Sequence, residues 1–370
     1  MMVRRDLVSL PVAMLLMAGG LGACQAERAS GGPGAGEAAK PVANSGSSFA
    51  TKTKVAATPE VRELSQIAIS QLRERAIETV QTGAASPNPQ IRANAMEAAG
   101  LAHARLVKVV DAGLSDESPA VRTVAALTVG RERMNELADH ASLLLQDPYP
   151  HVKAGAIFAM AKCGQSVDQT PLGTMLLRDP SPWVRRHAAF ILGELGNPSA
   201  LGLLRNASRN GLPDATPEQT KNFELQLDEA MVKLGELRAR EAIRAALYPS
   251  RPEELEATVL AIQIIGTTKD QAAADQLIHL VEFQDSTGQK YPPEVRLAIA
   301  GTLAQIGIPK GDFVVDEYVG DANPAVRAQA AWAYGQLATP RAMARLEGLL
   351  TDGDESVRVA AAAGVLKAMR

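Results

Sequence analysis

Aromatic residues are scarce in this chain. They make up 4% of its 370 residues, although 46% of the residues are hydrophobic. The apolar content is therefore mostly Ala, Leu, Val and Ile, which suits close packing of helices. Basic clusters are missing too, because no run of Lys and Arg follows Arg5 and the net charge is −3. A protein that binds duplex nucleic acid usually presents a basic face, so we expect no nucleic-acid partner.

Cysteine is almost absent, with Cys24 and Cys163 as its two copies. Two residues so far apart do not have the spacing of a metal site such as CxxC. Motifs for phosphate binding and hydrolysis are missing as well, because no P-loop, GxSxG or GxGxxG is placed where it could work. The sequence therefore predicts neither a metal nor a cofactor.

The first residues, MMVRRDLVSLPVAMLLMAGGLGAC, have the order of an export signal. Arg4 and Arg5 form a positive segment, and Leu7 to Met17 form a short apolar one. Such a length is typical of a signal peptide and is roughly half of the ~20 residues that a membrane-spanning helix needs. The next residues, Leu21-Gly22-Ala23-Cys24, resemble a bacterial lipobox, in which the cysteine sulfur accepts the lipid.

This resemblance implies a signal peptide at residues 1–23 and a lipid on Cys24, with an ordinary cleaved secretory signal as the alternative. More than one acyl chain gives stable anchoring, whereas a single chain does not. Gln25 is not the aspartate that resembles an inner-membrane retention signal, so the periplasmic face of the outer membrane is favoured. Residues 24–57 are rich in Gly, Ala, Ser and Pro and have no apolar period, which predicts a flexible tether.

Residues 58–370 contain a pattern that repeats every 31 residues or so. In each good copy an aliphatic residue is followed by Arg or Lys, and proline or an Ala pair often stands nearby. In five copies an Asp stands five residues before the aliphatic one, which gives the pairs Asp116/Arg122, Asp147/Lys153, Asp179/Arg185, Asp321/Arg327 and Asp352/Arg358. Two further copies, at Ile91-Arg92 and Val295-Arg296, lack the Asp, and with two poorer copies, near 223–235 and 254–266, we count nine.

The pattern resembles the HEAT repeat, in the version first associated with phycobilisome lyases. This resemblance covers residues 58–370 and implies an all-α solenoid (superhelix) of about nine HEAT-like helix pairs. Proline is tolerated in the first turn of the second helix, and the preceding Asp can cap that helix or accept a bond in the turn. We expect the recurrent Asp and Arg to form a ladder between neighbouring repeats.

Three segments depart from the regular pattern. The first helix, from Pro59 to about Gln81, is unusually polar and is expected to act as an N-terminal cap. The segments 209–222 and 283–293 break the period, carry Gly, Pro and polar residues, and are predicted to be long loops.

The segment DPSPWVRRHAAFILGELGNP, residues 179–198, gathers residue types that catalysis uses. Asp179 and Arg185 recur in other copies, so we assign them to the ladder, and Asn94 or Gln329 stands where this copy has His187. Deoxyhypusine hydroxylases, a HEAT-like family, bind iron through His-Glu pairs, and no histidine here is followed by Glu. A HEAT-like enzyme, either bilin lyase-like or metal-dependent, stays the alternative to a protein without catalysis.

Position seven of the second helix, counted from the aliphatic residue, projects toward the concave side of a solenoid. An apolar strip is predicted there, made of Leu127, Phe158, Phe190, Leu260 and Trp332. Aromatic groups in a groove are typical anchors for partners, although tight curvature could bury them between helices. The sequence thus predicts a lipid-anchored scaffold of the bacterial cell envelope that binds an unidentified protein or peptide. An architectural subunit of an envelope complex is a further alternative.

Overall fold

The computed structural model describes residues 65–249, 251, 254–284 and 287–370. The predicted signal peptide (1–23), Cys24 and the tether (24–57) lie outside these residues. The described chain forms eighteen α-helices and no strand, and one isolated antiparallel bridge joins Gln284 and Lys290. None of the described helices is long and apolar enough to cross a membrane. The prediction of an all-α solenoid is confirmed.

The helices follow one another in nine pairs, each with an outer helix and then an inner helix. The pairs are α2 (Gln66–Ala84) with α3 (Pro89–Gly100), α4 (His103–Leu114) with α5 (Pro119–Glu132), α6 (Ala138–Leu143) with α7 (Pro150–Lys162), α8 (Thr170–Arg178) with α9 (Pro182–Leu195), α10 (Leu201–Asn210) with α11 (Pro217–Lys233), α12 (Arg240–Ala245) with α13 (Leu255–Thr267), α14 (Ala274–Glu282) with α15 (Pro293–Gln305), α16 (Asp312–Asp316) with α17 (Pro324–Leu337), and α18 (Pro340–Leu349) with α19 (Glu355–Ala368).

The inner helices begin where the repeated residues predict. Seven of them carry proline in the first turn, where no helical hydrogen bond is lost. The recurrent Asp residues are turn acceptors. Asp116, Asp147, Asp179, Asp321 and Asp352 each accept a bond of 2.8–2.9 Å from the backbone N–H two residues later. This contact fixes the turn just before each of these inner helices.

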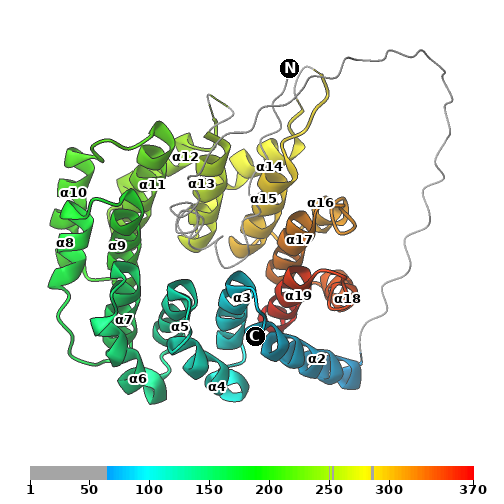
Figure 1. Cartoon of the computed structure of the whole chain (residues 1–370). Helices are drawn as coiled ribbons and strands as arrows, with labels where there is room; N and C mark the ends of the chain where they lie inside the picture. Colours follow the sequence, from blue (N-terminus) through cyan, green and yellow to red (C-terminus); the bar gives the residue numbers. More distant parts are fainter. Residues whose placement is uncertain (1–64, 250, 252–253, 285–286) are drawn as a thin grey trace, which may run out of the picture.

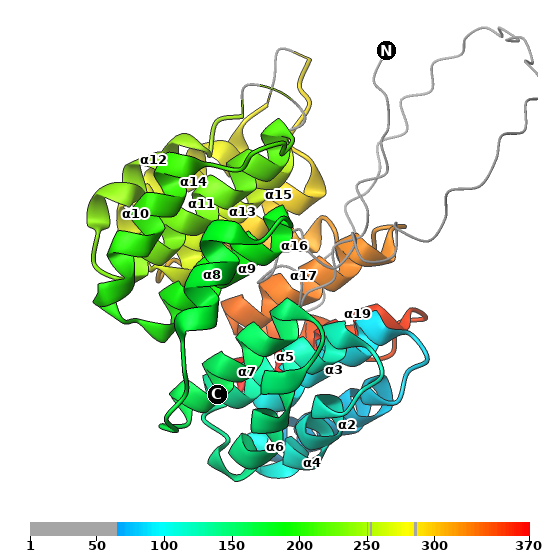
Figure 2. The same cartoon turned by 60° about the vertical axis from the view of Figure 1, so that its left-hand side comes forward.

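The array closes on itself. Each inner helix packs against the next one, from α3 to α19, and α19 then packs against α3 and α2. Figure 1 shows this closed path, with the blue α2 and α3 lying beside the red α19, and Figure 2 shows the same neighbours from another side. One hydrophobic cluster contains Leu72 of the first pair as well as Leu366 of the last. The solenoid is therefore a ring.

The polar sequence of the first helix predicted that α2 would cap the array and face solvent. In the structure α2 instead contacts the last helix pair. A Cβ on Gly83 of α2 would lie 2.5 Å from Val359 Cγ2 of α19, so the two helices touch there. Arg75 of α2 forms an ion pair with Glu347 of α18 at 3.1 Å. The cap prediction is wrong because the charged residues of α2 lie along one side, while its apolar residues Leu72, Ala76, Ile77 and Val80 are buried.

One predicted long loop is shorter than expected. Thr216 and Gln219 form a capping box, in which the Thr216 side chain accepts from the Gln219 N–H and the Gln219 side chain accepts from the Thr216 N–H. Such a box stabilises the first turn of a helix, so α11 already begins at Pro217 and only 211–216 form the loop. In the other segment, the described residues 283–284 and 287–292 lie between α14 and α15 as predicted, and a bridge joins Gln284 to Lys290.

Candidate functional site

The predicted apolar strip does not form an open surface. Leu127 and Phe158 are 1% exposed, Phe190 and Leu260 are 6% exposed, and Trp332 is half-buried. At Phe158 the reason is a close crossing of inner helices at a glycine. A Cβ on Gly130 of α5 would lie 2.6 Å from the Phe158 ring of α7, so the aromatic ring fills the space that the glycine leaves. Burial between helices, the alternative that the sequence left open, is therefore what the structure shows at Leu127, Phe158, Phe190 and Leu260.

Cations lie over two of these rings. Lys162 Nζ is 5.6 Å from the centroid of the Phe158 ring. Phe190 has two such neighbours, with Arg131 Cζ at 5.8 Å and Lys233 Nζ at 5.5 Å. A cation over an aromatic face is attracted by the electrons of the ring. The basic residues stand at position eleven of their inner helices, one helical turn after position seven, and thus on the same face.

A cavity of about 370 Å³ lies where the inner helices of the two halves of the ring face each other. Six inner helices contribute to its wall, namely α3, α5, α9, α11, α13 and α19. The first and last pairs of the array thus meet at one site because the ring is closed. Its apolar wall consists of Leu101, Phe190, Leu260 and Ile264. Phe190 and Leu260 therefore line a cavity and do not form a strip along a groove.

Ion pairs cross the wall of this cavity. Lys233 Nζ lies 2.5 Å from Glu194 and 2.6 Å from Glu229, which joins α9 to α11. Arg131 of α5 lies 3.5 Å from Glu97 of α3. A fourth pair joins Glu132 of α5 to Arg370, and it also closes the ring.

Burial sets the protonation of the acidic residues in different ways. Burial raises the pKa of Glu97 to about 7, and Arg131 opposes this rise only in part. Burial also acts to raise the pKa of Glu194, but Lys233 and Arg131 outweigh it and lower that pKa below its ordinary value. Glu194 is therefore ionised at neutral pH, while Glu97 exchanges its proton near pH 7.

The segment 179–198 contributes to a row of rings that leads to the cavity. Tyr149, His151, Trp183, His187 and Phe190 follow one another with centroid distances of 4.6–6.2 Å. Both histidines are buried, and burial lowers the pKa of His151 to about 4 and that of His187 to about 3. Both imidazoles are neutral at pH 7, and among the described residues neither Nε2 atom has a hydrogen-bond partner. The row packs α7 against α9.

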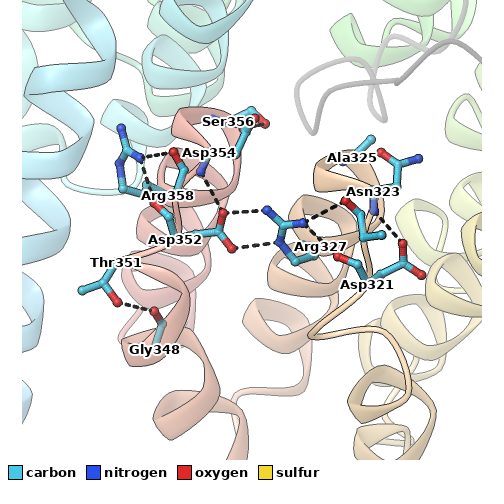
Figure 3. Close-up of polar contacts among 12 residues, drawn as sticks. Asp321, Asn323, Ala325, Arg327, Gly348, Thr351, Asp352, Asp354, Ser356 and Arg358 are labelled. Atoms are coloured by element: carbon cyan, nitrogen blue, oxygen red, sulfur yellow. Dashed lines mark hydrogen bonds and ion pairs between the residues drawn. The ribbon is translucent and has the colours of Figure 1, made fainter.

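The Asp and Arg residues lie as the ladder prediction requires at three places. The Arg of one repeat pairs with the Asp of the following repeat, as in Arg92–Asp116, Arg122–Asp147 and Arg327–Asp352, each with a contact of 2.8 Å. Figure 3 shows the last of these pairs, in which two parallel hydrogen bonds join the side chains. A further N–H of Arg327 donates to the Asp321 carbonyl at 2.8 Å. The guanidinium thus connects two successive turns.

Other predicted members of the ladder have different partners. Arg185 donates to the backbone carbonyls of Leu176 and Gly211 at 2.8 and 2.9 Å, although Asp214 stands three residues before Pro217 of α11. Asp214 has a left-handed backbone conformation, with φ of 59°. Lys153 forms no ion pair with Asp179. Arg358 donates to the carbonyls of Asp352 and Gly353 only. A pair that the sequence pattern missed, Arg296–Glu317 at 2.5 Å, uses Glu in place of Asp.

Metal-binding groups are not gathered in the part of the chain that the structure describes. No three residues of the His, Cys, Asp and Glu types are placed there to hold a metal ion. Cys163, the cysteine within this part, is a free thiol and half-buried. Burial raises its pKa above the ordinary value, which makes it a weak nucleophile at neutral pH.

Comparison with known proteins relates the chain to repeat proteins. No curated protein sequence matches it. Similar solved structures include an engineered protein (16% identity over 84% of this chain and 93% of that one, TM-score 0.33). Another is human deoxyhypusine hydroxylase in complex with glycerol (18% identity over 82% of this chain and 99% of that one, TM-score 0.35). A third is the CpcE–CpcF complex of phycocyanin lyase from Nostoc sp. PCC7120 (19% identity over 68% of this chain and 91% of that one, TM-score 0.36). These similarities carry no information about activity.

The family of HEAT repeats matches the chain directly, at residues 137–215 and 286–367. The first segment covers α6 to α10 of the ring, and the second covers α15 to α19. The HEAT repeats expected from the sequence are thus confirmed in these two segments, within an all-α solenoid.

Proposed function

We propose that this protein is a binding scaffold without catalysis, and that its ligand is a protein or peptide segment held in the centre of the ring. The observation that carries the proposal is the cavity of about 370 Å³. Ligand sites are concave, largely apolar and supplied with a few polar groups, and this cavity combines Leu101, Leu260 and Ile264 with charged and amide side chains. Stoichiometric iron or zinc in the purified protein would contradict the absence of catalysis.

A site-specific cross-linking experiment tests the scaffold function. A photoreactive amino acid at Lys367, an exposed residue that lines the cavity, is expected to form covalent adducts with a polypeptide in cells. The matched control carries the same group at Leu143 of α6, which is 69% exposed and lies away from the cavity. Adducts at 143 alone would contradict the proposal and favour an architectural subunit. Absence of adducts from both positions would contradict both functions.

We further propose that the chain is anchored by a lipid on Cys24 to the periplasmic face of the outer membrane of a bacterial envelope. The order of positive segment, apolar segment and LGAC supports this proposal, since small residues before the cysteine suit removal of the first 23 residues. We expect Cys24→Ser to move the protein from the membrane fraction to the soluble or precursor form, with loss of labelled palmitate. Unchanged labelling of the variant would contradict the lipid anchor.

A further inference from the structure

Gln263 of α13 has an unused carboxamide in the wall of the cavity. The residue is 6% exposed and lines the cavity. Neither its Oε1 nor its Nε2 has a hydrogen-bond partner among the described residues. Buried amide groups are nearly always hydrogen-bonded, to protein, to water or to a ligand. This side chain therefore requires a partner that offers an acceptor and a donor together.

A second buried group lines the same cavity without a partner. Thr128 of α5 is 3% exposed, and no described residue bonds to its Oγ1. Thr128 belongs to the second helix pair and Gln263 to the sixth, so the unused groups come from elements far apart in the chain. Two orphan polar groups in one cavity wall distinguish this place from an ordinary packing defect, which is apolar.

The charges of the wall other than that of the exposed Lys367 are paired among themselves. Lys233 is paired with Glu194 and Glu229, and Arg131 with Glu97. A ligand with a net charge would have to break one of these pairs or lie beside it, at a cost because the paired side chains are mostly buried. In the buried part of the wall, the hydrogen bonds that remain available are those of the neutral side chains Gln263 and Thr128.

We propose that the cavity binds an extended, uncharged peptide segment with an aliphatic side chain, and that Gln263 recognises its backbone. In an extended strand the N–H and C=O of one residue point to the same neighbour. The N–H of the bound residue would donate to Oε1 of Gln263, and its C=O would accept from Nε2. The aliphatic side chain would pack on Leu101, Leu260 and Ile264, and Thr128 would bond to the next peptide group. This inference rests on the proposed function and narrows it to one class of ligand.

The probe is acetyl-Ala-Leu-Ala-amide, titrated calorimetrically into the full chain in detergent. We compare it with the ester analogue in which an oxygen replaces the leucine N–H. The ester lacks the donor for Gln263 Oε1, so we expect binding about tenfold weaker. We expect the Gln263→Leu variant to bind the amide peptide about tenfold or more weakly than the unchanged protein does. We also expect this variant to bind the amide and the ester with equal affinity. The melting temperature and helical signal serve as folding controls.

Gln276→Leu is the matched control variant. Gln276 of α14 also has a side-chain oxygen without a partner, but it does not line the cavity, so its change is expected to leave binding unaltered. Equal binding of amide and ester by the unchanged protein would overturn the inference and leave the scaffold function standing, with water on Gln263. Absence of binding by both probes, together with absence of adducts at position 367, would overturn both proposals.

Discussion

Single arginine residues connect the repeats of this ring. Arg327 bonds in parallel to both carboxylate oxygens of Asp352 and also to the carbonyl of Asp321. These hydrogen bonds lower the pKa of Asp352, because they stabilise its ionised form. Lysine could not replace the arginine, because its ammonium is a point donor without the planar fork. Lys153, which forms no ion pair with Asp179, stands at one interruption of the ladder.

We expect Arg327→Ala to lower the free energy of unfolding by about 2–3 kcal/mol, since it removes charge-assisted bonds and leaves Asp352 poorly paired. Urea unfolding followed by circular dichroism measures this change. Arg358→Ala is the control, because Arg358 stands at the same position of the next repeat and contacts backbone carbonyls only. Equal losses for the two variants would show that the pair with Asp352 contributes nothing.

Asp, Arg and His serve in active sites as well as in structural contacts. Their recurrence in other repeats distinguishes a structural role from a catalytic one. Asp179, Arg185 and His187 stand within nine residues of one another. The copies of Asp and Arg elsewhere in the chain predict a structural role, and Arg185 does bond to backbone carbonyls. His187 has no such copies, and its neutral, buried ring lies stacked 5.6 Å from Trp183.

At the scale of the helices, periodicity predicts nearly all of the regular structure. The proline and aliphatic positions locate the inner helices, and nine copies become nine helix pairs. What periodicity does not give is the environment of position seven. Whether Phe158 is exposed depends on residue 130, which is glycine and leaves room for the ring. That residue belongs to another helix, and a helical wheel for α7 does not include it.

The cavity could have been predicted in part from the helices. Position eleven carries Arg131, Lys162, Glu194, Lys233 and Lys367, a run of charges on the concave face that an inert packing surface would not require. One turn separates position eleven from position seven, so the two share a face. Gln263 stands at position ten, where Gly130 and Gly193 stand in other copies, and only the three-dimensional structure reveals that it lines the cavity.

At the scale of the whole molecule, ring closure is the feature that the repeat pattern leaves open. An open solenoid and a ring use the same repeats, and the sum of small rotations between pairs decides between them. One local feature of the sequence does indicate ring closure. The last helix, ESVRVAAAAGVLKA, is apolar around most of its circumference, whereas a terminal helix that faces water on one side needs a polar face. Its second apolar side packs on α2 and α3.

A disulfide across the closure tests the ring, and with it the cavity, most directly. A Cβ on residue 83 would lie 2.5 Å from Val359 Cγ2, which is one bond of ~1.5 Å from Cβ. The two Cβ atoms are thus at most about 4.0 Å apart, which is close enough for a disulfide, whose Cβ atoms lie about 3.5–4.5 Å apart. Gly83→Cys with Val359→Cys, in the full chain with Cys24→Ser and Cys163→Ser, is expected to form an intramolecular disulfide under mild oxidation.

The control pair combines Gly83→Cys with Leu143→Cys. A cross-linked monomer from the first pair alone is the predicted result on a non-reducing gel. Free thiols or disulfide-linked dimers from the first pair would contradict the closed ring.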